Sequence, residues 1–451
     1  MENQNPSLSI PISRVAFPRE KYEPTGYFMI DQNKIATRIS DLFKKKDRNF
    51  VVASQIFGAL IALISGKLIA LYVHPTDFGT YGLQFAAFTL FSSVLIYPAI
   101  QFVKANYSKL VPKLGFRPFT IVLISVILIA FCGLMIFFQL YLDTVEMVLW
   151  GLLFIYMVFN AMNMLLNDFL NVQNKLILFS KIGMARVTAS LVFIGIFFFW
   201  HFEFMDHVQA LWGMQVAGSL VGILFFYRAY KSYTPKIKVH FKSFLKRYFH
   251  FAWPLGFSAL WIWISNYFDR YAIEYFLNIQ EVGVYSASYS VGSKFFLVIS
   301  PVFVILSTPI VFGNYKKQEK KKRLKTFGFY YSLIALPTLI LIYIFQETIG
   351  FLLLSEDYSD GFFLIFWIAL AFFLITLAQL LELYFYSEQR TRVILASNIA
   401  AASTNLLLNV LLIPSLGILG AAVATCCGFT AYFICTYLFF NQNEILSPLD
   451  E

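Results

Sequence analysis

The chain has 451 residues, of which 59% are hydrophobic and 13% are charged, and its formal net charge is +10. This composition excludes an ordinary soluble globular protein, because such chains carry about 25% charged residues. A net positive charge is typical of nucleic-acid-binding proteins, but membrane topology accounts for the excess of Lys and Arg in this chain. We therefore expect no nucleic-acid partner.

Residues 1–48 precede the first long apolar stretch. Residues 1–30 contain several prolines and show little hydrophobic periodicity, which indicates an extended tail. From Asp31 onward the apolar and basic residues separate onto different helical faces, which predicts an amphipathic helix on the cytoplasmic membrane surface. We interpret this helix as a flank that helps to orient the first span, and docking of a partner protein is the alternative.

Twelve apolar stretches follow, and each reaches or approaches the roughly 20 residues that cross a bilayer as a helix. They cover 50–73, 80–103, 118–141, 147–171, 180–200, 208–228, 251–276, 283–312, 327–346, 361–386, 393–413 and 418–440. The runs are continuously apolar and do not alternate with period two, so helices are favoured over a barrel. The sequence predicts an all-α polytopic membrane protein with about 12 transmembrane helices.

The Lys and Arg residues lie almost entirely on one side of these stretches. All but four of the 35 fall in the N-terminal segment or in every second connection, and the other connections contain none. Because basic residues resist translocation, both termini are expected to be cytoplasmic. The chain is expected to be a multi-pass membrane protein.

Two segments of the chain show an internal repeat. Asp77-Phe-Gly-Thr-Tyr81 opens the second stretch and Glu281-Val-Gly-Val-Tyr285 opens the eighth, and Pro98 and Pro301 follow at nearly the same distance. Six spans per repeat predict two parallel bundles related by an axis along the membrane normal, with a central cavity between them. The expected domains are the tail 1–48, a six-helix bundle 49–230, a basic linker 231–250, a second six-helix bundle 251–440 and a tail 441–451.

Four cations remain inside the predicted spans: Lys67, Arg186, Arg270 and Lys294. A charge at the bilayer centre costs about 2.5–3.5 kcal/mol on insertion scales, so each needs an explanation. Lys294 has the poorest route to water, which favours a cavity position. Lys67 could instead snorkel to the outer interface, and Arg186 could have a structural role near the inner surface.

The repeat relates two of these cations. Lys67 precedes Gly79 by 12 residues and Arg270 precedes Gly283 by 13, so they are expected at similar depths in opposite halves. Arg270 could also pair with Asp269 or Glu274, although neighbouring side chains such as those of Asp269 and Arg270 do not face each other well on a helix.

We take five residues as candidates for substrate binding. They are Lys67, Arg186, Arg270, Lys294 and Asp269. A cavity with several cations and few anions predicts an anionic or phosphorylated ligand. In the eleventh span, Asn398, Asn405 and Asn409 are expected to form hydrogen bonds between helices.

Sequence motifs offer little support for catalysis. The four cysteines lie in the spans without metal-ligand spacing, the five histidines form no cluster, and no GxxxxGK[ST] phosphate loop occurs. We expect no cofactor, no metal site and no enzymatic activity.

Three patches resemble the polysaccharide-unit flippases, of the O-antigen type, of the MOP exporter superfamily. They are LYVHPTDFGTYG at Leu71–Gly82, the run from Trp253 to Tyr289 with its Asp-Arg pair and VGVYSASY, and NLLLNVLLIPSLGILGAAVAT at Asn405–Thr425. The layout matches over about residues 50–440, and the tail 1–48 departs from the family pattern.

The resemblance implies a two-bundle transporter of the bacterial inner membrane. Such a protein would flip a polyprenyl-diphosphate-linked oligosaccharide from the cytoplasmic to the outer leaflet by alternating access, for surface polysaccharide biosynthesis. Its expected partners are this lipid-linked anionic oligosaccharide, membrane lipids and, as candidates, polysaccharide-assembly proteins. The alternatives are an ion-coupled, MATE-like exporter of small molecules and a membrane scaffold that acts through its N-terminal tail.

Overall fold

The computed structural model describes residues 46–107, 110–141, 146–173, 175–200, 205–226, 241–313 and 315–442. The chain divides into two units, Met1–Asn49 and Phe50–Glu451, and nearly all described residues belong to the second. The predicted amphipathic helix of the tail, half of the basic linker and most of the C-terminal tail lie outside the described residues. Those expectations remain predictions.

The N-half contains the first six expected stretches. Its helices are α2 (Lys46–Tyr72), α3 (Pro75–Phe91), the π-helical turn η1 (Ser92–Ile96), α4 (Tyr97–Asn106), α5 (Val111–Leu114), α6 (Arg117–Tyr141), α7 (Met147–Val172), α8 (Leu176–Trp200) and α9 (His207–Leu224). Local signals explain where some of them begin. Pro75 occupies the first turn of α3, where its missing N–H is harmless, and the Asp206 side chain accepts a hydrogen bond from the Gln209 N–H at the start of α9.

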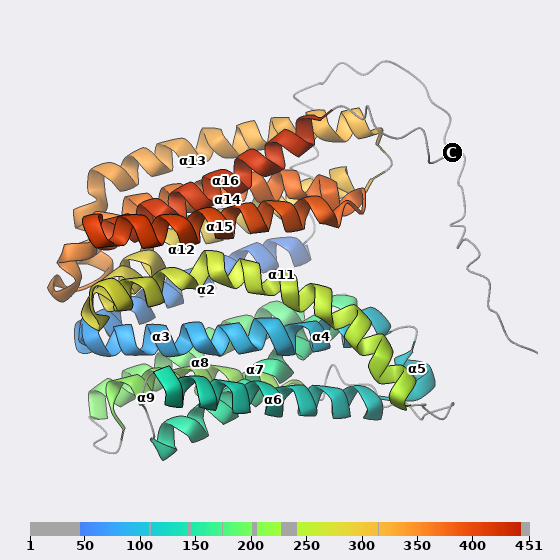
Figure 1. Cartoon of the computed structure of the whole chain (residues 1–451), viewed down its shortest axis with the longest axis horizontal. Coiled ribbons are helices and arrows are strands. Elements are labelled where there is room, and N and C mark those ends of the chain that lie inside the picture. The colour runs from blue at the N-terminus through green and yellow to red at the C-terminus, as the bar shows by residue number, and fades with distance from the viewer. Residues whose placement is uncertain are drawn as a thin grey trace, which may run out of the picture. The chain divides into compact units, whose positions relative to one another are not determined.

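The C-half contains the last six. Its helices are α11 (Phe241–Phe276), α12 (Ile279–Val311), α13 (Lys317–Leu353), the 3-10 turn η2 (Glu356–Gly361), α14 (Leu364–Ser387), α15 (Thr391–Leu416) and α16 (Ile418–Asn441). Figure 1 shows α13–α16 together on one side, and α3, α4 and α6–α9 together on the other.

The prediction of an all-α polytopic membrane protein is confirmed. Ten helical stretches of the described chain are long and apolar enough to cross a membrane, with α3, η1 and α4 counted as one. The sixth and seventh expected spans correspond to α9 and α11, which fall outside this set. α11 is rich in polar residues such as Asn266, Asp269 and Glu274, and α9 carries His207, Gln209 and Gln215 within its 18 residues.

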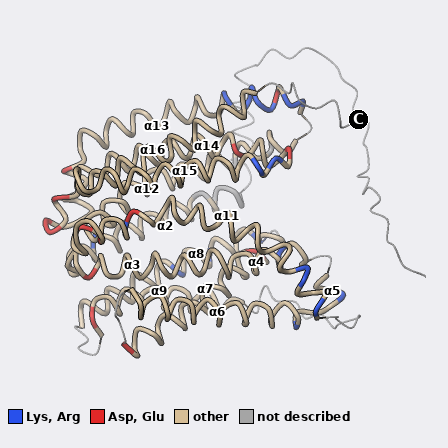
Figure 2. Tube along the Cα trace, viewed as in Figure 1, with Lys and Arg blue, Asp and Glu red and all other residues tan. Residues whose placement is uncertain are grey.

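Charge separates the two ends of the helices (Figure 2). We call the end with the connections α2–α3, α6–α7, α8–α9, α11–α12 and α13–α14 the acidic end, and the opposite end the basic end. Described acids beside these connections are Asp77, Glu146, Asp206, Glu274, Glu281, Glu356, Asp357 and Asp360. No described residue of these connections is Lys or Arg.

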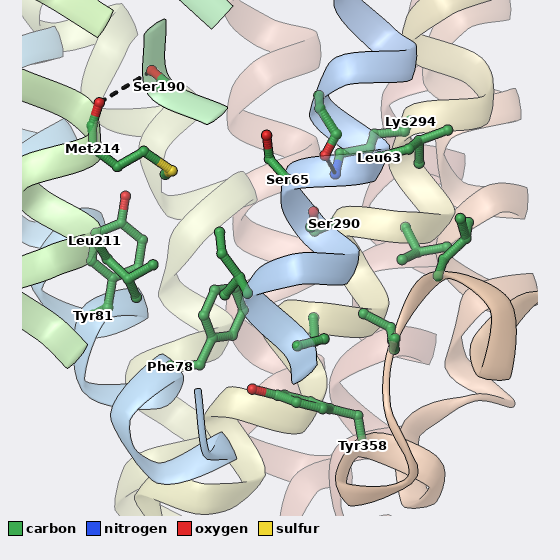
Figure 3. Close-up of a pocket in the computed structure, with 18 of the residues that line it drawn as sticks. Leu63, Ser65, Phe78, Tyr81, Ser190, Leu211, Met214, Ser290, Lys294 and Tyr358 are labelled. Atoms are coloured by element: carbon green, nitrogen blue, oxygen red, sulfur yellow. Dashed lines mark hydrogen bonds between the residues drawn. The ribbon is translucent and has the colours of Figure 1, made fainter. Parts of the chain in front are cut away.

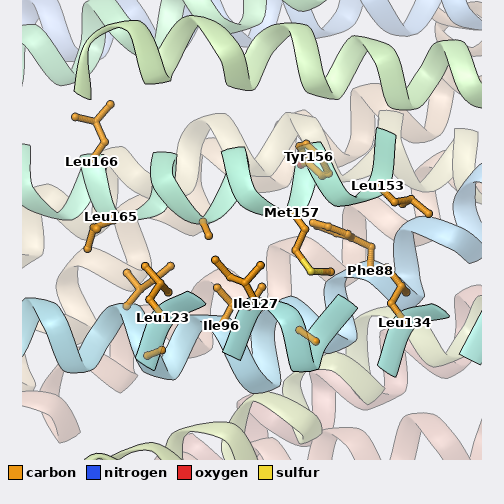
Figure 4. Packing of buried hydrophobic residues seen from close by; sticks show 14 of the residues in the cluster. Phe88, Ile96, Leu123, Ile127, Leu134, Leu153, Tyr156, Met157, Leu165 and Leu166 are labelled. Atoms are coloured by element: carbon orange, nitrogen blue, oxygen red, sulfur yellow. The ribbon is translucent and has the colours of Figure 1, made fainter. Parts of the chain in front are cut away.

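Each half has its own apolar core. In the N-half, α3, α6 and α7 interdigitate through large side chains such as Phe88, Ile127 and Met157 (Figure 4). Trp212 of α9 is fully buried there, and its indole N–H donates to the Gln84 side chain at 2.8 Å. A buried indole thus keeps its hydrogen bond, as its burial requires.

A proline explains how α11 approaches the N-half. Pro98 has no N–H for the carbonyl of Val94, four residues earlier, and the helix widens there into the π turn η1. The Val94 oxygen instead faces Gly256 of α11, where an added Cβ would lie only 2.8 Å away. The glycine therefore permits close contact between α11 and η1.

The two repeat motifs meet each other where α3 crosses α12. A Cβ on Gly79 would lie 2.1 Å from the Ile279 oxygen, and a Cβ on Gly283 would lie 1.8 Å from the Pro75 oxygen. Ile279 precedes Gly283 by four residues, as Pro75 precedes Gly79. The contact is therefore reciprocal, as expected for two halves related by a two-fold axis.

Candidate functional site

A cavity of about 340 Å³ lies between the two halves. The N-half contributes lining residues from α2, α3, α8 and α9, and the C-half contributes them from α12 and from the α13–η2 corner. The polar lining side chains are Ser65, Tyr81, Ser190, Gln215, Ser290, Lys294 and Tyr358. All of these except Gln215 are labelled in Figure 3. Of the described residues that line it, Lys294 is the one charged side chain.

Lys294 extends from α12 toward the first helix of the other half. Its Nζ donates to the backbone oxygen of Ala62 at 3.2 Å, and a Cβ on Gly66 would lie 3.4 Å from the same nitrogen. An ammonium has three protons to donate, and this is its one hydrogen bond among the described residues. Lys294 thus keeps donor capacity for a ligand in the cavity.

Arg186 lies one turn before Ser190 on α8, on the basic side of the cavity. Its neighbour Val187 lines the cavity, whereas Arg186 itself does not. The Arg186 Nε is buried without a hydrogen-bond partner among the described residues. A buried, unsatisfied donor of a charged group is costly, so a ligand that reached it would gain affinity.

Lys67 does not line the cavity but contacts the end of α13. Its Nζ donates to the backbone oxygens of Phe351, at 2.8 Å, and Leu354. Carbonyls at the C-terminal end of a helix lack partners within the helix and carry partial negative charge. The ammonium of Lys67 is therefore satisfied by protein in this conformation.

Arg270 and Asp269 form a buried ion pair inside the C-half. The Arg270 Nη1 lies 2.9 Å from Asp269 Oδ1 and also donates to the Asn266 oxygen at 2.8 Å. The expectation that these neighbours would not face each other well is wrong, because the guanidinium folds back along its own helix. Tyr267 and Tyr289 cover it, with ring centroids 5.1 and 4.8 Å from the guanidinium carbon.

A hydrogen-bonded chain extends from this ion pair through three further helices. The Tyr285 hydroxyl donates to Asp269 Oδ2 at 2.5 Å and lies 3.3 Å from Thr425 Oγ1. Asn405 donates to the same threonine at 3.3 Å, and Asn409 donates to Asn405 at 2.9 Å. Asn405 thus links α15 to α16 as predicted, whereas the hydrogen bonds of Asn398 and Asn409 to described residues lie within α15.

Lys67 and Arg270 are not equivalent, although the repeat suggested that they were. Twelve residues before Gly283, the position that matches Lys67 is Tyr271. One residue turns a helical side chain by about 100°. As a result Lys67 reaches the opposite half, whereas Arg270 bonds within its own half.

The hydroxyl and amide groups of the cavity were not singled out from the sequence. Tyr81 alone carried a signal, since it closes the first repeat motif. Serines such as Ser65, Ser190 and Ser290 are common in packed membrane helices, so nothing in the sequence marked them. Burial raises the pKa of Tyr358, and the nearby carboxylates Asp357 and Asp77 raise it further, so its hydroxyl stays protonated.

Metal-ligand clusters do not occur among the described residues, where no three or more His, Cys, Asp or Glu side chains come together. The donor set of the cavity consists of hydroxyls, one amide and one ammonium, which suits an anionic or hydroxyl-rich ligand better than a cation.

Comparisons with known proteins bear on both the family and the fold. Residues 46–312 match the family model described as polysaccharide biosynthesis protein. No match was found among curated proteins.

Solved structures share the fold at low sequence identity. The lipid II flippase MurJ in an inward closed conformation has a TM-score of 0.66 at 12% identity, over 87% of this chain and 87% of that one. An inward-facing multidrug resistance MATE transporter of the MOP superfamily has 0.65 at 13%, over 85% and 93%. A mutant of the Vibrio cholerae MATE transporter VcmN has 0.59 at 16%, over 91% and 97%.

The family model covers more than half of the chain, and the resemblance that the sequence motifs suggested is thereby confirmed. The two pseudo-repeat bundles are those of MATE transporters and MurJ. The chain belongs to the polysaccharide biosynthesis protein family and has the fold of MOP-superfamily transporters.

Proposed function

We propose that this protein flips a polyprenyl-diphosphate-linked oligosaccharide across the bacterial inner membrane, for surface polysaccharide biosynthesis. The substrate would enter at the basic end, which the distribution of Lys and Arg assigns to the cytoplasm, and leave at the acidic end. The two halves would rock about the central cavity while the lipid tail stays in the bilayer. No catalytic step is part of this proposal.

The observation that carries the proposal is the chemistry of the cavity. It lies between the halves and holds one ammonium, several hydroxyls and no carboxylate among its described lining residues. Hydroxyls and amides match sugar hydroxyls, and an ammonium matches a phosphate or an acidic sugar. A cavity for organic cations would need the opposite sign of charge.

Two of the five candidate residues are best placed to bind the diphosphate. Lys294 projects into the cavity from the C-half. Arg186 lies on α8 of the N-half, next to the lining residue Val187, and its Nε is buried without a partner among the described residues. Lys67, Arg270 and Asp269 already have protein partners in this conformation. We therefore assign Lys294 and Arg186 to the substrate and the other three to the protein framework.

An ion-coupled exporter is the rival function. It needs a membrane carboxylate that is free to take a proton or a metal ion, and the sequence offered Asp269 for this role. In the structure that carboxylate accepts hydrogen bonds from Arg270 and Tyr285 and is fully buried. This satisfied state disfavours Asp269 as a coupling group.

Transport by charge-neutral variants tests the proposal. Proteoliposomes that contain a fluorescent polyprenyl-diphosphate-linked sugar report its arrival in the opposite leaflet. Lys294→Gln and Arg186→Gln should each slow this step about tenfold or more, because each removes a charge-assisted hydrogen bond to the diphosphate. Lys294→Arg should retain most activity.

The matched control is Lys104→Gln. Lys104 is a lysine of α4 that pairs with Asp168 at 2.7 Å within the N-half, away from the cavity. It should transport at the parent rate. Full activity of the Lys294→Gln/Arg186→Gln double variant would refute the assignment of these residues to the substrate.

A further inference from the structure

The first helix of each half is bound at the acidic end to the third helix of the other half. The α2 latch consists of Lys67, Ala70 and Val73 with the α13–η2 corner at Phe351, Leu354, Ser355 and Tyr358. Besides the two bonds of Lys67, Ser355 donates to the Ala70 oxygen at 2.6 Å and Tyr358 donates to the Val73 oxygen at 2.8 Å. Four side-chain hydrogen bonds therefore tie the N-half to the C-half here.

The α11 latch is its counterpart in the other half. Tyr271, at the position that matches Lys67, donates to the Leu83 oxygen of α3 at 2.9 Å, and its ring lies 5.4 Å from that of Tyr141 at the end of α6. The Tyr141 hydroxyl donates to Glu274 at 2.7 Å. The residues differ, but each first helix reaches across to the opposite half at the same end.

The α2 latch lies at the acidic end of the cavity. Tyr358 of the α2 latch lines the cavity and also lies 6.3 Å, edge to face, from Phe78 of the N-half (Figure 3). The reciprocal contact of Gly79 and Gly283 joins α3 to α12 at this same end. Opening of the acidic end therefore requires that these bonds between the halves break.

We propose that Lys67 is a positioning residue that holds the acidic gate shut, and that the α2 and α11 latches act together as this gate. The proposal rests on the proposed transport by alternating access. Lys67 acts through the α13–η2 corner and does not bind the substrate. Its ammonium releases the helix-end carbonyls when the acidic end opens, and water there can satisfy both partners.

A lysine suits this place because its hydrogen bonds to the helix-end carbonyls can form and break readily. An ammonium on two helix-end carbonyls gains a charge-assisted bond when shut and is readily hydrated when open, since Lys67 lies near the acidic end of its span. An ion pair buried at this depth would be harder to break. Lys67 therefore suits a contact that forms and breaks in every cycle.

Sidedness of cysteine labelling tests the latch without any substrate. In the full chain with Cys132, Cys426, Cys427 and Cys435 replaced by Ala, Ser290→Cys places one thiol in the cavity wall. A membrane-impermeant maleimide is applied from the acidic end in intact cells and from the basic end in inside-out vesicles. Lys67→Met should raise the labelling rate from the acidic end about tenfold and lower it from the basic end.

Four further variants complete the test. Lys67→Arg retains the cation and should label like the parent, as should Lys104→Met, whose pairing with Asp168 lies near the basic end. Tyr141→Phe should raise labelling from the acidic end by a smaller factor, about threefold, because it loosens only the α11 latch. If Lys67→Met does not reach the membrane, Ser355→Ala combined with Tyr358→Phe removes the other two bonds of the α2 latch and should give the same rise.

The proposal would be overturned if labelling were unchanged in Lys67→Met. It would also be overturned if labelling of Lys67→Met rose equally from both ends, or if labelling of the control Lys104→Met rose as much. The outcome is separable from that of the proposed function. A protein that does not flip the lipid-linked sugar but still shows the one-sided rise retains its gate, whereas normal flipping without that rise rejects the gate alone.

Discussion

The central cavity and the interior of the C-half each hold a cation within the membrane, but the two cations differ in how many partners the protein gives them. In the cavity, Lys294 has one hydrogen bond among the described residues, to Ala62, and faces open space. In the C-half, Arg270 has a carboxylate, a carbonyl and covering tyrosine rings. A buried charge needs partners, so the cation with few of them is the one available to a ligand. Depth in the membrane alone does not distinguish the two.

The largest effect should come from removal of one partner of the buried ion pair. Asp269→Ala leaves the Arg270 guanidinium buried without its counter-charge, which should lower the free energy of unfolding by about 3–5 kcal/mol. Thermal unfolding in detergent and membrane abundance measure it. Asp269→Asn combined with Arg270→Met removes both charges and should recover most of the loss. A stable Asp269→Ala protein would show that the pair is not a framework element.

A smaller loss is expected one step along the hydrogen-bonded chain. Tyr285→Phe removes the hydroxyl between Asp269 and Thr425, and the buried carboxylate loses one donor but keeps the guanidinium. The expected cost is about 1–3 kcal/mol, measured by the same unfolding assay. Tyr285→Phe in the Asp269→Asn/Arg270→Met background should cost less, since no charge then needs the hydroxyl. Equal costs in the two backgrounds would contradict coupling along the chain.

The smallest effect on stability should come from the cavity. Lys294→Met keeps the apolar stem and loses one hydrogen bond, at 3.2 Å. The free energy of unfolding should therefore change by no more than about 1 kcal/mol. Transport should nevertheless fall as it does in Lys294→Gln. A Lys294→Met protein as unstable as Asp269→Ala would erase the distinction between the two regions.

Sequence patterns predicted much of this molecule because they report on properties that a membrane enforces. Apolar run length located the spans, and the connections without Lys or Arg lie together at the acidic end. The repeat was visible at Gly79 and Gly283 because close helix contact admits no larger residue there. These signals depend on local composition and spacing, which a single chain displays.

The partners of the four cations were harder to predict, since they depend on tertiary contacts. Lys67 meets carbonyls that lie 284 residues or more away in sequence, on a helix end whose position only the folded bundle defines. Arg270 bonds to its neighbour in a place where tyrosines from α11 and α12 cover its guanidinium. Sequence spacing alone gives no information on either arrangement.

The reciprocal glycine contact also constrains how such a chain could arise. Gly79 against Ile279 and Gly283 against Pro75 are the pairings that two identical six-helix chains would make across a symmetric homodimer interface. A gene for one such chain would encode both sides of the interface at once, and its duplication and fusion would preserve them. After such a fusion the two copies of a position could change independently, and the matching positions of Lys67 and Tyr271 do differ.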